Sequence, residues 1–427
     1  MDSTLRRRWY QIILVAVIMY TISFIDRMNV AVAIPHMRQT LGLGPTAAGL
    51  TSGIFFIGYF IFQVPAGKWS VRFGSKRMIA LLLILWGIFA AACGIAQNAM
   101  ELYAARFLLG LVEGGIWPAT LILLGNWFVA EERARANALW MICLPLGGAI
   151  AGPLSGTLIA HLGWRWMFVL EGIPALVWVV PWLLLIEDGP EKVSWLSENA
   201  KHYLTSKLKE EEAHRKNTVK NLKWTAWAFN PMVMMLSLVY ILSIIGGYGV
   251  LLWLPSIIKQ LSGKGIQWVG SISAIPYIVA MIVMVVSGYL ADKTGRRVLI
   301  TVVSLCMAAI SMFLTAFTGT HAWLLTIVLL SIAVGGFFGR QGPLWAIPST
   351  VLPRELAGPA MGFINAFGNL GGFIGPVLFG ALLGATHNFV RGYLVLSLCM
   401  ILSAVLMTVI GARSSRKEVA IAETQGI

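Results

Sequence analysis

Long apolar stretches, separated by short runs of charged residues, glycine or proline, dominate the chain. About 20 consecutive apolar residues are needed for a helix to cross the hydrocarbon core of a bilayer. We expect such helices over residues 10–34, 46–66, 78–96, 102–127, 136–160, 164–186, 232–254, 269–290, 298–318, 322–348, 359–383 and 393–411. The pattern therefore predicts an all-α membrane protein with twelve transmembrane helices.

One long polar segment divides these spans into two groups of six. It contains a charged run, 207–212, which is typical of a solvated helix or a plain connector. We expect the domains to be an N-terminal six-helix bundle over 1–186, a cytoplasmic linker over 187–223, a C-terminal six-helix bundle over 224–411 and a cytoplasmic tail over 412–427. The first span carries Asp26 and lacks a following cleavage site, so we interpret it as a retained helix.

Composition and charge agree with this class of protein. Hydrophobic residues make up 58% of the chain, charged residues 12%, and the mean hydropathy is +0.79. The net charge of +14 comes from lysines and arginines that gather in the loops on one side of the membrane, if both termini are cytoplasmic. Topology thus explains the charge, and nucleic-acid binding is not needed.

Four charged side chains interrupt the apolar spans. Asp26 and Arg27 lie in the first, and Arg106 and Glu113 lie in the fourth. An ionisable side chain at the bilayer centre costs at least about 2.5–3.5 kcal/mol, so these four are expected to face a polar cavity. Residues seven apart share a helix face and lie about 10.5 Å apart along the axis, which places Arg106 and Glu113 at two depths of one cavity.

The pairing of acids with arginines suggests a mechanism. A carboxylate beside a guanidinium stays ionised, whereas one that loses its partner in a dry site takes up a proton. We hypothesise that an anionic substrate competes with Asp26 or Glu113 for Arg27 and Arg106, and that the released acid is then protonated. The alternative is a static ion pair that holds helices together.

Other polar and aromatic residues are expected in the same cavity. Arg340 is a candidate for binding a second acidic or polyol group, although an interhelical or cytoplasm-facing pair is equally consistent with its position. We expect Glu171 to make a structural hydrogen bond to a neighbouring helix. The remaining candidates for substrate binding carry amides or aromatic rings, which leaves sugar acids and aromatic acids both open: Tyr59, Trp117, Tyr248, Trp345, Asn365 and Asn369.

Several classes of chemistry have no support in the sequence. The four cysteines are scattered through the spans without metal-ligand or disulfide spacing. All six histidines lie at span ends or in loops, so carboxylates rather than imidazoles should carry protons. Because there is no His-Glu-x-x-His or Gly-x-Ser-x-Gly motif, we expect no enzyme activity, metal or cofactor.

The two halves of the chain also repeat each other. The loop from Gly67 to Gly74 follows the second span, and the loop from Gly288 to Gly295 follows the eighth, each trailed by basic residues. Parallel internal repeats are typical of transporters whose halves are related by a pseudo-two-fold axis and whose substrate binds near the midplane between them.

These loops resemble the Gly-x-x-x-Asp-Arg-x-Gly-x-Arg/Lys hallmark of the major facilitator superfamily, although Val71 replaces the acid in the first copy. The resemblance covers essentially the whole chain and implies gating roles for a set of loop residues. They are Gly67, Arg72, Gly74, Asp292, Gly295 and Arg296.

Within that superfamily the chain is similar to the anion:cation symporter group, on the segments 24–27, 58–67, 106–118, 164–172 and 365–372. This similarity implies import of a small organic anion with protons through the bacterial cytoplasmic membrane, by a monomer. It assigns proton coupling to Asp26 and Glu113, and anion binding to Arg27 and Arg106. A proton-driven exporter is the alternative, because the segment 148–156 resembles an antiporter motif.

Overall fold

The computed structural model describes residues 3–219, 229–318, 322–352 and 354–425, and all regular secondary structure in these ranges is helical. The chain forms two compact units. The first comprises Met1–Lys220 with Gly263–Ala274, and the second comprises Asn221–Ser262 with Ile275–Ile427.

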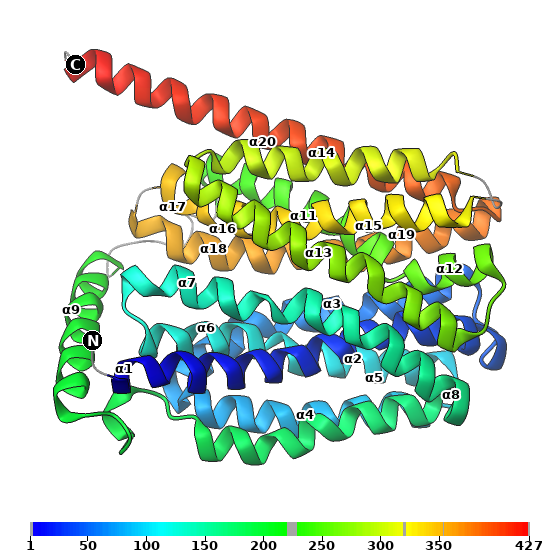
Figure 1. The fold of residues 1–427 in the computed structure, drawn as a ribbon, viewed down its shortest axis with the longest axis horizontal. Coiled ribbons are helices and arrows are strands. Elements are labelled where there is room, and N and C mark those ends of the chain that lie inside the picture. The colour runs from blue at the N-terminus through cyan, green and yellow to red at the C-terminus, as the bar shows by residue number, and fades with distance from the viewer. Residues whose placement is uncertain (1–2, 220–228, 319–321, 353, 426–427) are drawn as a thin grey trace. The chain divides into compact units, whose positions relative to one another are not determined.

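The first unit is built from helices that enclose a common core (Figure 1). In chain order they are α1 (Ser3–Arg8), the π-helical η1 (Trp9–Ile13), α2 (Leu14–Thr40), α3 (Pro45–Phe73), α4 (Ser75–Ile95), α5 (Ala99–Gly114), α6 (Ile116–Trp127), α7 (Ala130–Met141), α8 (Cys143–Leu185), η2 (Pro190–Lys192) and α9 (Glu198–Val219).

The second unit has a similar run of helices. They are α11 (Pro231–Leu251), α12 (Leu254–Ser262), α13 (Ile266–Thr294), α14 (Arg297–Thr315), α15 (Trp323–Gly339), α16 (Gln341–Ala346), α17 (Pro348–Val351), α18 (Arg354–Asn369), α19 (Gly371–Thr386) and α20 (Val390–Gln425). The first residues of α13 are grouped with the first unit.

Eleven segments of the described residues are long and apolar enough to cross a membrane. One of them, Ala130–Leu185, has 56 residues, and a straight helix of that length would measure about 84 Å, well over twice a 30 Å hydrocarbon core. Within it, Gly163 has φ 82° and ψ 164°, and the chain reverses there (Figure 1). This segment therefore supplies two crossings, which agrees with the twelve predicted.

Large apolar side chains cover the outside of the helices, as expected for a protein surrounded by lipid. On the second half of α8, Val177, Val180 and Leu184 are 60–78% exposed, whereas Glu171 and Trp182 on the same helix are buried. The four charged residues of the first and fourth predicted spans are likewise buried inside the bundle.

Three predicted spans are interrupted near the polar residues. The helix is interrupted for one residue at Gly115, two residues after Glu113, at Arg340, and at Leu370, directly after Asn369, although the backbone keeps right-handed helical angles at all three. Such irregularities at membrane depth are tolerated where the backbone is buried in protein or lines a cavity. The described part of the polar segment, 187–219, differs from a plain connector, because α9 packs against the first unit: Glu211 accepts hydrogen bonds from Arg133 and from the amide of Ala130, both 2.8 Å.

Candidate functional site

Close packing of α3 against α5 brings the first set of candidate residues together. A Cβ atom at Gly110 or Gly114 of α5 would overlap the backbone of Phe55 or Tyr59 in α3, and one at Gly58 would overlap the backbone of Phe107. Glycine at these positions lets the two helices touch, as small residues do in many membrane bundles. The contact places the aromatic rings of Phe55 and Tyr59 beside the charged face of α5.

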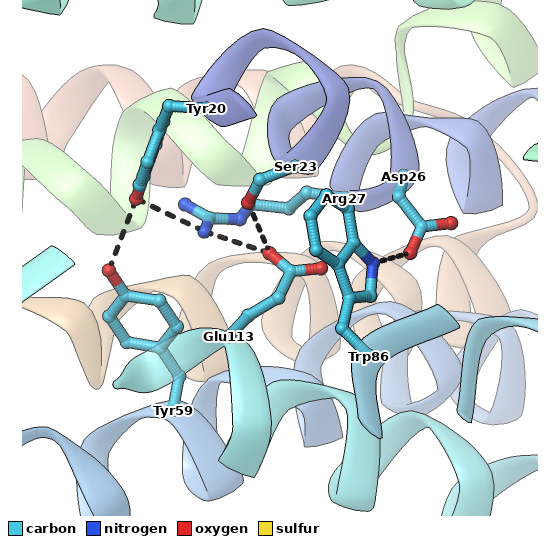
Figure 2. A network of polar contacts seen from close by, with 7 residues as sticks. All are labelled: Tyr20, Ser23, Asp26, Arg27, Tyr59, Trp86 and Glu113. Atoms are coloured by element: carbon cyan, nitrogen blue, oxygen red, sulfur yellow. Dashed lines mark hydrogen bonds and ion pairs between the residues drawn. The ribbon is translucent and has the colours of Figure 1, made fainter. Parts of the chain in front are cut away.

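Arg27 and Glu113 form a buried ion pair between α2 and α5. The Arg27 Nη2 to Glu113 Oε2 distance is 3.1 Å, and the two side chains are 4% and 0% exposed. Ser23 donates a second hydrogen bond to the same carboxylate oxygen at 2.9 Å (Figure 2). Removing either partner of such a buried pair leaves an uncompensated charge in the protein interior, so each side chain stabilises the charged form of the other.

Aromatic residues enclose the guanidinium group of Arg27. It lies 4.9 Å from the ring centre of Tyr59 and 5.3 Å from that of Phe55, distances typical of cation–π contacts. It also donates to the Tyr20 hydroxyl at 3.4 Å, and that hydroxyl lies 3.4 Å from the hydroxyl of Tyr59 (Figure 2). The positive charge therefore lies against the electron-rich faces of these rings.

Asp26 points to a different set of partners. Trp86 of α4 donates its indole N–H to Asp26 Oδ2 at 2.5 Å, and Asn29 donates to Oδ1 at 2.8 Å (Figure 2). The same Asn29 amide reaches Glu171 of α8 at 2.9 Å, and Ser155 donates to Glu171 at 2.8 Å. The prediction that Glu171 bonds to a neighbouring helix is thus confirmed.

Arg106 is fully buried but is not tied to its neighbours. Its three guanidinium nitrogens have no protein hydrogen-bond partner among the described residues, and its one close aromatic neighbour is Phe55, at 5.0 Å from the ring centre. Glu113 Oε1 likewise has no hydrogen-bond partner within the described ranges. A buried guanidinium with all its donors unused is costly in a closed protein, and it is well suited to receive a planar anion such as a carboxylate.

The second unit contains a comparable arginine, Arg340, at the break between α15 and α16. It is 0% exposed, and its Nη1 donates to Gln341 at 3.0 Å, while Nε and Nη2 have no protein hydrogen-bond partner among the described residues. The ring of Phe337 lies 4.4 Å from it, and the ring of Tyr240 lies 5.4 Å away. Within the described ranges no ion pair engages Arg340, which leaves the alternative of an interhelical ion pair without support there.

Tyr240 connects Arg340 to other predicted residues. Its ring packs edge-on against Trp345 at 5.1 Å, and its hydroxyl lies 3.5 Å from Asn365 Oδ1. Asn369 donates to the carbonyl oxygen of Asn365 at 2.8 Å. Arg340, Trp345, Asn365 and Asn369 therefore form one cluster, which we call the C-cluster.

Two predicted aromatic residues lie among other rings. Trp117 packs 4.5 Å from Trp140 and 5.4 Å from Tyr20, so it adjoins the Arg27 network. Tyr248 packs edge-on against Phe337 at 6.0 Å and so adjoins Arg340. Each is mostly buried, and packing accounts for the greater part of its surface.

All the predicted gating residues except Gly67 lie at helix ends. Gly67 lies within α3, Arg72 lies in its last turn, and Gly74, with φ 89°, ends it. In the second copy, Gly295 has φ 68° and separates Asp292, in the last turns of α13, from Arg296. The φ values explain why both copies keep glycine at these positions.

Val71 replaces the motif's aspartate in the first loop, but another acidic residue, Asp188, lies beside this loop. Asp188, just after α8, accepts a hydrogen bond from the backbone amide of Lys76 at 2.8 Å, and a Cβ at Gly74 would overlap its carboxylate. Glu187 pairs with the Lys76 side chain at 2.5 Å. These contacts cap the start of α4 and fasten it to the end of α8.

Several residues that contact the charged groups of the two units were not predicted from the sequence. Ser23 and Tyr20 lie four and seven residues before Arg27, a helical spacing that could have revealed them. Trp86, Tyr240 and Gln341 gave no such signal, because an aromatic or amide residue in an apolar span looks like packing. No group of three His, Cys, Asp or Glu side chains among the described residues could hold a metal ion.

Comparisons with known proteins agree with this architecture. Residues 16–376 match the family model described as "Major Facilitator Superfamily". A "putative tartrate transporter" from Agrobacterium vitis is 35% identical over 421 residues, covering 97% of this chain and 92% of the relative. A "quinolone resistance transporter" from Acinetobacter baumannii is 32% identical, with coverages of 97% and 96%. The solved structure of the proton:xylose symporter XylE has a TM-score of 0.74 at 18% identity, covering 94% and 95% of the two chains.

Proposed function

The chain belongs to the Major Facilitator Superfamily and is a multi-pass membrane transporter rather than an enzyme, and from this premise we propose that it imports a small organic anion together with protons by alternating access. The superfamily and the all-helical fold predicted from the sequence are confirmed. The substrate class, the coupling ion and the direction of transport are the content of the proposal.

One observation carries the proposal: Arg106 is buried without a hydrogen-bond partner in the described part of the chain, close to an arginine that is paired with an acid. A lipophilic cation would be repelled by these two guanidinium groups. A carboxylate would satisfy the free donors of Arg106 in the bidentate geometry that arginine prefers. The site therefore favours an anion.

Competition for the arginines links the anion to protons. If a substrate carboxylate approaches Arg27, the ion pair at 3.1 Å weakens and Glu113 is left buried without its cation. A buried carboxylate in that situation takes up a proton. Asp26, which is held by Trp86 and Asn29, provides a second buried acid in the same unit. We assign proton coupling to Glu113 and Asp26 on this basis.

Electrical work gives a physical reason for the coupling. A monoanion that enters a cell with a negative interior moves against about 2.3 kcal/mol per 100 mV. One accompanying proton cancels this term, and two protons make entry electrically favourable. Two acids near the arginines are sufficient for either stoichiometry.

The C-cluster is proposed to bind the remainder of the substrate. Arg340 has unused donors, and Asn365, Asn369 and Trp345 offer amide groups and a ring. Amides hydrogen-bond hydroxyl groups, so a hydroxylated acid such as a sugar acid would be held better than a plain aliphatic acid. The relative from Agrobacterium vitis is named for tartrate, which supports a hydroxylated dicarboxylate as the first substrate to test.

Topology and gating are also part of the proposal. We place both termini and the segment 187–223 in the cytoplasm, because lysine and arginine gather in the loops on that side. Gly67, Arg72 and Gly74, together with Asp292, Gly295 and Arg296, are then cytoplasmic gating residues. We propose a monomer in a bacterial cytoplasmic membrane, as the bacterial relatives suggest.

Drug or metabolite export is the second candidate function. The relative from Acinetobacter baumannii, named for quinolone resistance, is nearly as similar as the tartrate relative and is covered over nearly its whole length. An exporter would have to accommodate its substrate beside Arg27 and Arg106, which favours an acidic compound over a cationic one.

Uptake into proteoliposomes separates the two functions. The protein is offered a panel of carboxylates, including tartrate, sugar acids and aromatic acids, under an imposed inward proton gradient, with a cationic dye as the competing substrate. The proposal predicts gradient-dependent accumulation of a hydroxylated acid. Uptake that ignores the gradient would exclude symport, and proton-driven extrusion of the dye would favour the exporter.

A further inference from the structure

One buried amide bridges two carboxyl groups in the first unit. Asn29 Nδ2 donates to Asp26 Oδ1 at 2.8 Å and to Glu171 Oε2 at 2.9 Å. The other two oxygens are also occupied, Asp26 Oδ2 by Trp86 and Glu171 Oε1 by Ser155. All four carboxyl oxygens therefore bond to neutral donors, and all five side chains are at most 4% exposed.

The two acids differ in how much positive charge they feel. Asp26 lies within electrostatic reach of Arg106 and Arg27, whereas the charged group that acts on Glu171 is the carboxylate of Asp26. In the described part of the chain no ion pair engages Glu171. A carboxylate buried without a cation is strongly disfavoured relative to the neutral acid.

The charge balance of the unit points to the same group. Apart from Arg8, which is neutralised by its ion pair with Glu132, its spans bury the guanidinium groups of Arg27 and Arg106 and the carboxyl groups of Asp26, Glu113 and Glu171. Arginine remains cationic in proteins, so two positive and three negative groups leave one negative charge in a dry region. One bound proton makes the set neutral. Glu113 has its ion pair with Arg27, and Asp26 is near Arg106, so Glu171 is the group left to hold it.

A buried acceptor provides an independent sign of a missing hydrogen. Asn29 Oδ1 is buried and has no hydrogen-bond donor among the described residues. The network thus contains five acceptor oxygens, four from the carboxyl groups and one from Asn29, but only four donor hydrogens, from Trp86, Ser155 and the two of the Asn29 amide. A proton on one of the carboxyl groups raises the number of donor hydrogens in this network to five.

We propose that Asp26 and Glu171, joined through Asn29, form a proton-binding site distinct from the Arg27–Glu113 pair, with one proton resident on Glu171 in the described conformation. Binding forms an O–H bond on Glu171, and release returns that proton to water when the site opens. Asp26 then remains the ionised member, available for a second proton when an anion draws Arg106 away.

Tight packing keeps this site dry. A Cβ at Gly172 would lie 3.0 Å from the carbonyl oxygen of Gly87, so α4 lies close against the turn of α8 that carries Glu171. The buried titratable and charged side chains on the helices around it are Tyr20, Asp26 and Arg27 of α2, Cys93 of α4, and Arg106 and Glu113 of α5. The two arginines are the cations of that set, and neither forms an ion pair with Glu171.

Infrared difference spectroscopy of the purified protein in lipid tests the assignment without substrate. A neutral buried carboxyl group has a C=O stretching band separate from those of carboxylates, and the band shifts in D₂O. We expect this band at neutral pH in the wild type, its loss in Glu171→Gln, and its retention in Glu113→Gln. Its retention in Glu171→Gln, or its absence from the wild type, would overturn the proposal.

Isotope labelling of the wild-type protein tests the same assignment without relying on a variant that must fold. Wild-type protein made with ¹³C-glutamate should show the band at a lower frequency, whereas a proton on Asp26 would leave it unmoved and contradict the assignment. Loss of the band on adding sodium ions at constant pH would show that the site takes a metal cation instead. The role of this proton in coupling rests on the proposed symport, whereas the presence of the infrared band does not. A protein that shows the band but does not couple anion transport to protons would therefore refute the proposed symport and leave the proton on Glu171 in place.

Discussion

Replacing Arg106 with methionine should stabilise the protein and abolish transport. The guanidinium group is 0% exposed, and none of its nitrogens has a protein hydrogen-bond partner in the described part of the chain. Leaving buried donors unsatisfied costs about 1–3 kcal/mol, and more for a charged group. Loss of the attraction to Asp26 offsets part of the gain, so we expect a net stabilisation of roughly 1 kcal/mol. For a unit of this size that corresponds to a rise in Tm of about 2–4 °C.

The matched variant Arg27→Met should behave in the opposite way. Arg27 is paired with Glu113 at 3.1 Å, and removing one partner of a buried pair is destabilising by about 3–5 kcal/mol, less where the remaining acid takes up a proton. Arg6→Met, at an exposed position of the same unit, serves as the control and should leave Tm unchanged.

Thermal unfolding of the three variants in one detergent, together with anion uptake, provides the assay. A fall in Tm for Arg106→Met as large as that for Arg27→Met would mean that Arg106 is a structural residue with partners of its own. Full uptake by Arg106→Met would remove it from anion binding. Either result would refute the reasoning that makes this arginine the receptor for the substrate.

Three further predictions follow from the contacts described above. Glu113→Gln should keep anion exchange between the two sides of the membrane but lose accumulation of the anion, which for one coupled proton is about tenfold per unit of pH difference. The control variant Glu131→Gln changes an exposed acid and should accumulate the anion normally. Normal accumulation by both variants would exclude Glu113 from proton coupling. Asp188→Ala removes the acceptor for the Lys76 amide at the start of α4 and should lower the stability by about 1 kcal/mol, measured as Tm; an unchanged Tm would show that the cap is not needed. Arg340→Gln should raise the KM for a hydroxylated dicarboxylate more than for a simple monocarboxylate, and equal effects on both in uptake assays would place Arg340 outside the site.

Much of the fold could be predicted because lipid imposes a simple rule on the sequence. Long apolar runs had to become helices, since no other structure satisfies the backbone in a bilayer. The reversal at Gly163 falls between the predicted spans 136–160 and 164–186. The interruptions at Gly115, Arg340 and Leu370 were not predicted, because they depend on packing between helices rather than on hydrophobicity along one of them.

The charged members of the site were visible in the sequence because charge within an apolar span is conspicuous. Their pairing was not visible: Glu113 bonds to Arg27 rather than to Arg106 on its own helix, and Asp26 bonds to Trp86. These contacts depend on how α2, α4 and α5 rotate toward one another. The roles of two further features are visible only in the packed helices: the glycines at the contact between α3 and α5, and the bridging amide of Asn29.

Proton movement measured alongside anion movement tests the central claim most directly. Proteoliposomes that hold the wild-type protein and a pH-sensitive dye are exposed to the transported acid outside, with no imposed gradient. The account predicts acidification of the interior that accompanies anion entry, and the loss of both in Arg106→Met. Anion entry at the normal rate without acidification would contradict it.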